Sequence, residues 1–243
     1  DTDTLGMNLP ENDLSGYSRF FDERIDMGAY ESRYNTFTGD VSDDWSDPDN
    51  WTAGVPFEGV DVDVEPGNLL TISGSATCNT MEIDSGATVI INSSKGQMII
   101  EEELILKSPE NSGATGTIID NGTLTVNGSF TIERFLETNS TTNNWRYISI
   151  PVNNVSAADL DIPAPDRLLY YWDEPADSWQ QITNGSTALD VMKGYAYGFT
   201  AADTMISFSG NPNTGTLSRN NLTRSSASNN FEGFYLVGNP YPS

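Results

Sequence analysis

Five aspartates that lie within ten residues form a dense set of potential metal ligands. They are Asp40, Asp43, Asp44, Asp47 and Asp49. Carboxylate oxygens are ligands that Ca²⁺ prefers, so this stretch could hold a calcium ion. The spacing lacks the alternating acidic pattern and the distal Glu of an EF-hand loop, and Asp side chains also cap turns. The stretch therefore predicts either a calcium site, with calcium as the one cofactor that the sequence suggests, or a series of capped turns.

A second candidate site is a short aromatic stretch with acidic residues between its two ends. Its aromatic members are Tyr170, Tyr171, Trp172 and Trp179. Sugar rings stack on Trp and Tyr faces, which makes Tyr171, Trp172 and Trp179 candidate carbohydrate-binding residues. The stretch also predicts a hairpin with an acidic tip, in which Trp172 and Trp179 could simply pack as a cross-strand pair. Both interpretations remain open at this point.

Residue types that usually carry out catalysis are scarce. The chain has no His and one Cys, Cys78, so the commonest general base and the usual activator of a thiol are both missing. Three consecutive glutamates at 101–103 cannot all face one site in an extended strand, because successive side chains alternate between faces. The sequence gives no catalytic residue, and we expect a protein that is not an enzyme.

The charge of the chain excludes several partners. Lys and Arg number 11 against 35 Asp and Glu, which gives a formal net charge of −24. Such a surface repels phosphate backbones, so we expect no binding to nucleic acid. No apolar run approaches the roughly 20 residues of a membrane-spanning helix, so we also expect no membrane span.

The sequence around these candidate residues predicts β-strands and no long helices. From 59 to 135, aliphatic residues alternate with polar ones and are interrupted by Gly-containing turns, which is typical of short strands. The segments 83–89 and 119–126 resemble each other, and 100–106 fits a third copy midway between them. A repeat near 18 residues, half the offset between the first two, predicts a parallel β-solenoid whose coils stack on one another.

The pattern of strand-like runs changes after a polar stretch at 136–144. Strand-like runs become longer and more aromatic, with Pro, Gly and Asn turns between them, which favours a β-sandwich. We therefore expect an all-β protein: a short parallel β-helix or β-solenoid followed by a β-sandwich. The predicted divisions are 1–38 as a terminal coil and linker, 39–135 as a solenoid with a Trp- and Asp-rich cap, and 136–243 as the sandwich.

Three stretches resemble a known group of proteins. The first is Asp13-Leu14-x-Gly16, Arg19 and Ile25-Asp26-x-Gly28-Ala29-Tyr30-Glu31. The second is Trp45, Pro48, Asn50, Trp51, Gly54, Val55 and Pro56. The third comprises 145–152, 193–195 and 236–243. Together they resemble large secreted surface proteins of Bacteroidetes-type bacteria, in which a right-handed β-helix end, a solenoid module and a sandwich module precede a type IX secretion sorting domain.

The resemblance implies an extracellular or cell-surface protein. In such a protein the solenoid would be a stiff, non-catalytic spacer and display scaffold with an adhesive role. The alternative is a carbohydrate-binding accessory region of a polysaccharide-degrading enzyme. The partner would be an extracellular glycan or another surface protein. The sandwich pattern is interrupted at Ser243, so we expect that module to be incomplete in this chain.

Overall fold

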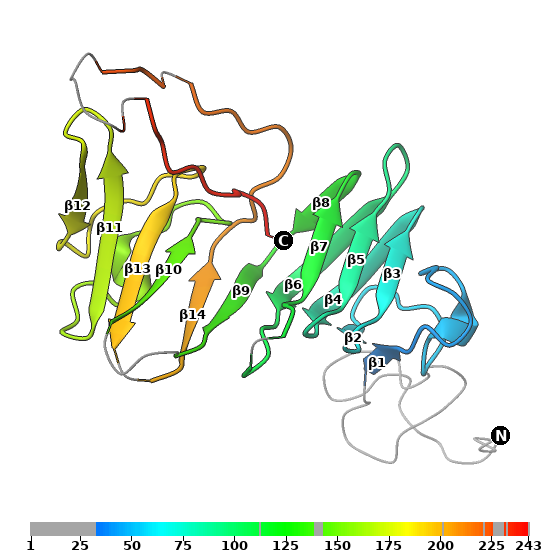
Figure 1. Ribbon diagram of the computed structural model, residues 1–243. Helices are drawn as coiled ribbons and strands as arrows, with labels where there is room; N and C mark the ends of the chain where they lie inside the picture. Colours follow the sequence, from blue (N-terminus) through cyan, green and yellow to red (C-terminus); the bar gives the residue numbers. More distant parts are fainter. Residues whose placement is uncertain are drawn as a thin grey trace, which may run out of the picture.

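The computed structural model of the protein describes residues 33–111, 113–138, 143–200, 202–220, 222–225, 231 and 233–242. This part is all-β, with 14 strands and two short 3₁₀ segments, η1 (Pro48–Asn50) and η2 (Ala157–Leu160). Parallel strands occupy one half of the molecule, and a separate twisted sheet occupies the other (Figure 1). Of the terminal coil and linker predicted for 1–38, residues 1–32 lie outside the described residues. No helix in the described ranges is long or apolar enough to span a bilayer.

The largest sheet has seven strands in the order β1-β2-β4-β6-β9-β14, with β8 also paired to β6. Every pairing is parallel except that of β14 with β9, which is antiparallel. The strands are β1 (Tyr34–Phe37), β2 (Asp61–Val64), β4 (Ser75–Ile83), β6 (Gln97–Leu106), β8 (Thr123–Val126), β9 (Ser129–Leu136) and β14 (Thr204–Ser209). Since β14 comes from the second half of the sequence, it joins the two halves through one continuous sheet.

A second parallel sheet contains β3 (Leu69–Ile72), β5 (Thr88–Ile91) and β7 (Thr117–Asp120). The chain alternates between the two sheets from β2 to β8, so each parallel neighbour is reached after a passage through the other sheet. Paired positions in the large sheet lie 19 residues apart at Asp61↔Thr80, 23 at Thr80↔Glu103 and 26 at Glu103↔Ser129. Each passage is longer than the one before it.

The predicted 18-residue repeat is therefore wrong in its register. Ile83 pairs with Leu106 in the large sheet, whereas Ile119 pairs with Ile90 in the three-stranded sheet. The two similar segments are strand ends followed by Gly-containing turns, but they occupy different corners of the chain path. The two segments resemble each other because both contain a strand end and a Gly-containing turn. They are not stacked on each other as equivalent parts of successive coils.

The core of this half is formed by the alternate residues of each strand. The fully buried side chains include Val62, Val64, Leu70, Ile72, Met81, Ile83, Val89, Ile91, Met98, Ile100, Leu104, Leu106 and Ile132. This confirms the alternation that the sequence predicts, since their neighbours along each strand are more exposed. At one end, Trp45 and Trp51 are also buried, and their rings meet edge to face at 4.8 Å.

Close stacking leaves no room for side chains at some corners. At Gly128, a Cβ atom would overlap the carbonyl group of Glu102 on the neighbouring strand. Glycine is therefore required there by the approach of two backbones.

The other half contains a four-stranded antiparallel sheet in the order β10-β13-β11-β12. Its strands are β10 (Asn143–Ile148), β13 (Tyr195–Thr200), β11 (Arg167–Asp173) and β12 (Ser178–Ile182). One face of this sheet is packed in the core through Leu169, Tyr195, Tyr197 and Phe199. In the described residues after 143, the remaining strand, β14, belongs to the large sheet, so the β-sandwich stays a prediction.

Candidate functional site

The opposite face of the four-stranded sheet carries five aromatic side chains. Strand alternation and register place them together, because Trp145 pairs with Gly198, Tyr147 and Tyr170 both pair with Ala196, and Trp172 pairs with Trp179. We call this surface the aromatic face, and its members are Trp145, Tyr147, Tyr170, Trp172 and Trp179.

The central strand, β13, supplies only small residues at the middle of the aromatic face. Ala196 and Gly198 point to this side, while Tyr195, Tyr197 and Phe199 point to the core. A Cβ atom at Gly198 would lie 2.9 Å from the Trp145 ring, so the absence of a side chain lets the indole lie over β13. The surface of the sheet is therefore low over Ala196 and Gly198 of β13, which we call the floor of the aromatic face. Aromatic rings on the neighbouring strands rise above this floor on both sides.

A pocket of about 400 Å³ lies over this floor, and Trp145, Arg146, Tyr147, Tyr170, Trp179 and Ala196 line it. The rings of Tyr147 and Trp179 are nearly parallel, with 13° between their planes and 6.2 Å between their centroids. Trp145 meets Tyr170 edge to face at 5.7 Å. The exposed fractions are 72% for Tyr147, 44% for Trp145 and 40% for Trp179, so large aromatic surfaces remain accessible.

The structure brings together two of the three predicted carbohydrate-binding residues. Trp172 and Trp179 are direct cross-strand partners whose rings meet edge to face at 5.7 Å. The cross-strand pair that the sequence suggested is therefore present, and Trp179 also remains exposed at the pocket. Tyr171 lies on the other face of β11, where the Lys193 ammonium sits 3.7 Å above its ring. It does not belong to the aromatic face.

The sequence interpretation missed Trp145 and Tyr147. Both lie in a run that reads as a strand, and they occupy alternate positions, which places them on one face. The missing information was the pairing of β10 with β13, because strand order within an antiparallel sheet is a long-range property.

The aromatic face carries no charge from the described strand residues. Its polar strand members are Thr200 and Gln181, which are neutral. Arg146 lies between two members of the face along β10, but its guanidinium sits 5.9 Å from the ring of Phe199, a core-side residue. In a protein with a net charge of −24, this surface is suited to an uncharged ligand that offers apolar rings and hydroxyl groups.

Four of the five aspartates of the predicted calcium site accept hydrogen bonds within their own loop or from a neighbouring strand, and the fifth, Asp49, donates through its backbone N–H. Asp44 Oδ1 accepts from the backbone and hydroxyl of Ser46, and Asp47 Oδ1 accepts from Asp49 N. Asp43 and Asp40 accept from the hydroxyl groups of Thr71 and Thr38. Over the described ranges, no three acidic or thiol side chains lie close enough together to hold a metal ion. The capped turns are present, and calcium binding by this loop stays a prediction.

The single cysteine, Cys78, lies in the core of the protein. Cys78 is fully buried in the parallel half, and burial raises the pKa of its thiol well above the usual value. The thiol is therefore protonated at neutral pH and is a poor nucleophile.

A family model described as a domain of unknown function (DUF8693) matches residues 36–243, which include strands β2 to β14 and therefore the aromatic face. No curated protein and no solved structure matches the chain.

Proposed function

Because the chain belongs to the DUF8693 family, whose description names no activity, we propose a function from the geometry of the aromatic face: it binds a neutral carbohydrate. The observation that carries the proposal is the group of accessible rings around a pocket with a small-residue floor. Sugar rings present flat C–H surfaces that pack on aromatic faces, and their hydroxyl groups bond with neutral polar side chains. The geometry thus favours the carbohydrate-binding alternative over a spacer without a ligand.

The charge distribution supports a neutral glycan over an acidic one. Of the residues that line the pocket only Arg146 is cationic, and its guanidinium lies near the ring of the core-side Phe199, while the net charge of −24 would repel uronate and sulfate groups at longer range. A neutral polysaccharide does not meet this repulsion. Its binding should therefore depend little on salt, because no ion pair contributes to it.

The parallel half serves in this proposal as a scaffold. We interpret the alternation between its two parallel sheets as a short β-solenoid, whose close-packed core makes it stiff. The antiparallel pairing of β14 with β9 supports a firm connection between this scaffold and the half that carries the aromatic face. Such a body would display a glycan-binding surface at one end of a secreted, extracellular protein, and the proposal assigns it no catalytic step.

Affinity electrophoresis tests the proposal. The native chain is run through gels that contain neutral polysaccharides, such as β-glucans, xylan and mannan, or acidic ones, such as pectate and alginate. We expect retardation by at least one neutral glycan, at least about 5-fold weaker binding for Trp179→Ala, and no change for Phe57→Ala, which removes an exposed aromatic outside the face. Retardation by acidic glycans only, or equal retardation of both variants, would refute the proposal.

A further inference from the structure

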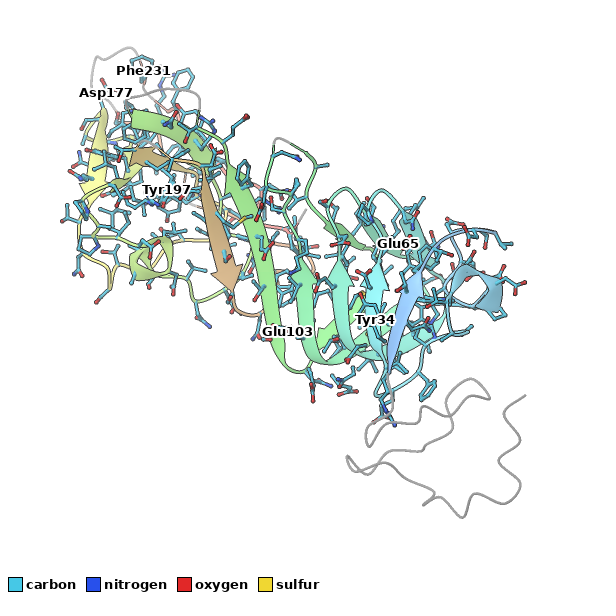
Figure 2. The ribbon with its side chains drawn as sticks, turned by 90° about the horizontal axis from the view of Figure 1, so that it is seen from below. Tyr34, Glu65, Glu103, Asp177, Tyr197 and Phe231 are labelled. Carbon is cyan, nitrogen blue, oxygen red and sulfur yellow. The ribbon has the colours of Figure 1, made fainter. Side chains whose placement is uncertain are left out.

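The tip of the β11–β12 hairpin carries two acidic residues, Glu174 and Asp177. Asp173 and Ser178 form the last paired position, and Asp177 N donates to the carbonyl oxygen of Glu174 at 3.1 Å across the turn that follows. Glu174 and Asp177 are therefore the first and last residues of the turn, beyond the last strand pair, and Figure 2 labels Asp177 and Phe231 at the same end of the molecule. Asp173 points to the face of the sheet opposite the aromatic face.

The carboxylate of Glu174 is buried and only half satisfied. Its residue is 2% exposed. Oε1 accepts hydrogen bonds from Ser225 N at 2.9 Å and Gly233 N at 2.7 Å, and these donors hold the pKa of Glu174 below its usual value. Oε2 is buried and has no hydrogen-bond partner. A charged, buried oxygen of this kind needs a compensating group, because an unpaired carboxylate oxygen is costly to remove from water.

Other unpartnered oxygens lie in the same corner. Over the described residues, six buried side-chain polar atoms lack a hydrogen-bond partner, and four of them belong to Trp172, Glu174, Asp177 and Ser225. Three of these four are oxygens: Glu174 Oε2, Asp177 Oδ1 and Ser225 Oγ. Ser225 is held against Glu174 by its backbone N–H, and Asp177 by the hairpin turn. The fold therefore places two carboxylate oxygens and a hydroxyl at this end of the hairpin, none of them with a hydrogen-bond partner, and the Ser225 side chain also lowers the pKa of the Glu174 carboxyl.

We propose that this corner binds a hard divalent cation, Ca²⁺, through Glu174 Oε2, Asp177 Oδ1 and Ser225 Oγ. Ca²⁺ takes six to eight oxygen ligands, so water would complete its coordination. The charge of Arg224 also acts on Glu174 and offsets part of its negative charge. Few protein ligands and a neighbouring cation place the site in the weak class of extracellular calcium sites, at roughly 10⁻⁴ to 10⁻³ M.

The cation would connect the segment after β14 to the aromatic face. The backbone of Ser225 and Gly233 already bonds to Glu174, and Phe231 contacts Trp172 edge to face with 5.8 Å between centroids. A cation shared by the hairpin tip and Ser225 would hold Phe231 in that contact. The inference concerns metal binding and does not depend on the proposal that the face binds glycans.

Two measurements on the full chain test this site. Thermal unfolding is followed in 5 mM CaCl₂ and in EDTA, and we expect calcium to raise the Tm by about 3 °C or more, since it binds only the folded state. Tb³⁺, which replaces Ca²⁺ at oxygen sites, should show emission sensitised by Trp172, and excess Ca²⁺ should reduce that emission. Trp172→Phe should lose most of the sensitised signal.

Variants locate the ligand set. Glu174→Gln and Asp177→Asn should each lose most of the calcium-induced shift, whereas Asp173→Asn, a neighbouring acid on the other face, should keep it. The comparison of calcium with EDTA within each variant removes any effect of the substitution on basal stability, and circular dichroism verifies that each variant folds. A native chain that shows no calcium-induced shift would overturn the proposal. An unchanged shift in Asp177→Asn, or its loss in Asp43→Asn instead, would do so as well.

Discussion

Tyr147 and Trp179 lie on strands that do not pair with each other, yet their rings are nearly parallel at 6.2 Å between centroids. Strands β13 and β11 separate them, and the small Ala196 on β13 leaves the space over which both side chains lean. The pocket therefore depends on the order of the strands: the outer strands carry Trp145, Tyr147 and Trp179, the inner strand β11 carries Tyr170, and the inner strand β13 carries the floor.

Gly198→Ala tests how the floor positions the Trp145 indole. The added Cβ atom would lie 2.9 Å from a ring carbon, so the indole must shift away from β13. We expect weaker glycan binding and a change in tryptophan fluorescence, with the far-UV circular dichroism of the native chain retained. Unchanged fluorescence and binding would show that the ring position does not depend on this glycine.

Gly128→Ala tests the close stacking of the parallel strands. The new Cβ atom would overlap the backbone carbonyl of Glu102, which cannot move without disrupting the pairing of β6 with β9. We expect a loss of about 2 kcal/mol or more in the free energy of unfolding, measured by urea denaturation. Gly74→Ala is the matched control, because nothing lies within 4 Å of its Cβ position, and we expect almost no loss there.

Asn50→Ala tests the loop that precedes β2. This buried side chain accepts hydrogen bonds from Val41 N and Ser42 N and donates to Ser42 Oγ and Asp44 O. Its removal leaves several of these groups without partners, so we expect a loss of about 2 kcal/mol or more. Hydrogen exchange at the amides of 41 and 42 should accelerate. Slow exchange in the variant would contradict the role of Asn50 as the centre of this loop.

Asp63→Asn tests the electrostatics on the outer face of the large sheet. Burial and then the charge of Asp84 raise the pKa of Asp63 to about 6, from 3.8, and a hydrogen bond from Tyr34 acts in the opposite direction. The folded state therefore binds a proton that the unfolded state releases between pH 4 and 6, so this group's contribution to stability increases as the pH falls through that range.

The variant has no such titration. Asp63→Asn should be more stable than the native chain above pH 6, and the difference should shrink as the pH falls towards 4. Thermal unfolding of both proteins between pH 4 and pH 8 measures it. A difference that grows on acidification would have the wrong sign for this explanation.

The sequence predicts the local part of this fold well and the long-range part less well. The alternation at Val62 and Val64, and the burial of residues such as Met81 and Ile83, follow from period-two patterning, which depends on near neighbours only. The prediction that Ile83 and Ile119 occupy equivalent positions was wrong, because strand register depends on how many residues separate neighbouring parallel strands. That separation varies from 19 to 26 residues.

The candidate site shows the same division. Trp172 and Trp179 are joined by a four-residue turn, so their pairing could be inferred from sequence. Trp145 and Tyr147 reach the same face through β13, which lies some fifty residues away along the chain. The alternation of Tyr171 with Trp172 would have excluded Tyr171 from the face, because adjacent strand residues point to opposite sides.

Titration calorimetry with a neutral oligosaccharide from a retarding polysaccharide determines whether the aromatic face binds carbohydrate. It compares the native chain with Tyr147→Ala, Trp179→Ala and the double variant. We expect each single substitution to weaken binding at least about 5-fold. The two effects should also fall short of additivity, because the two rings shape one pocket. Native affinity in both single variants, with all proteins folded, would contradict carbohydrate binding by the aromatic face.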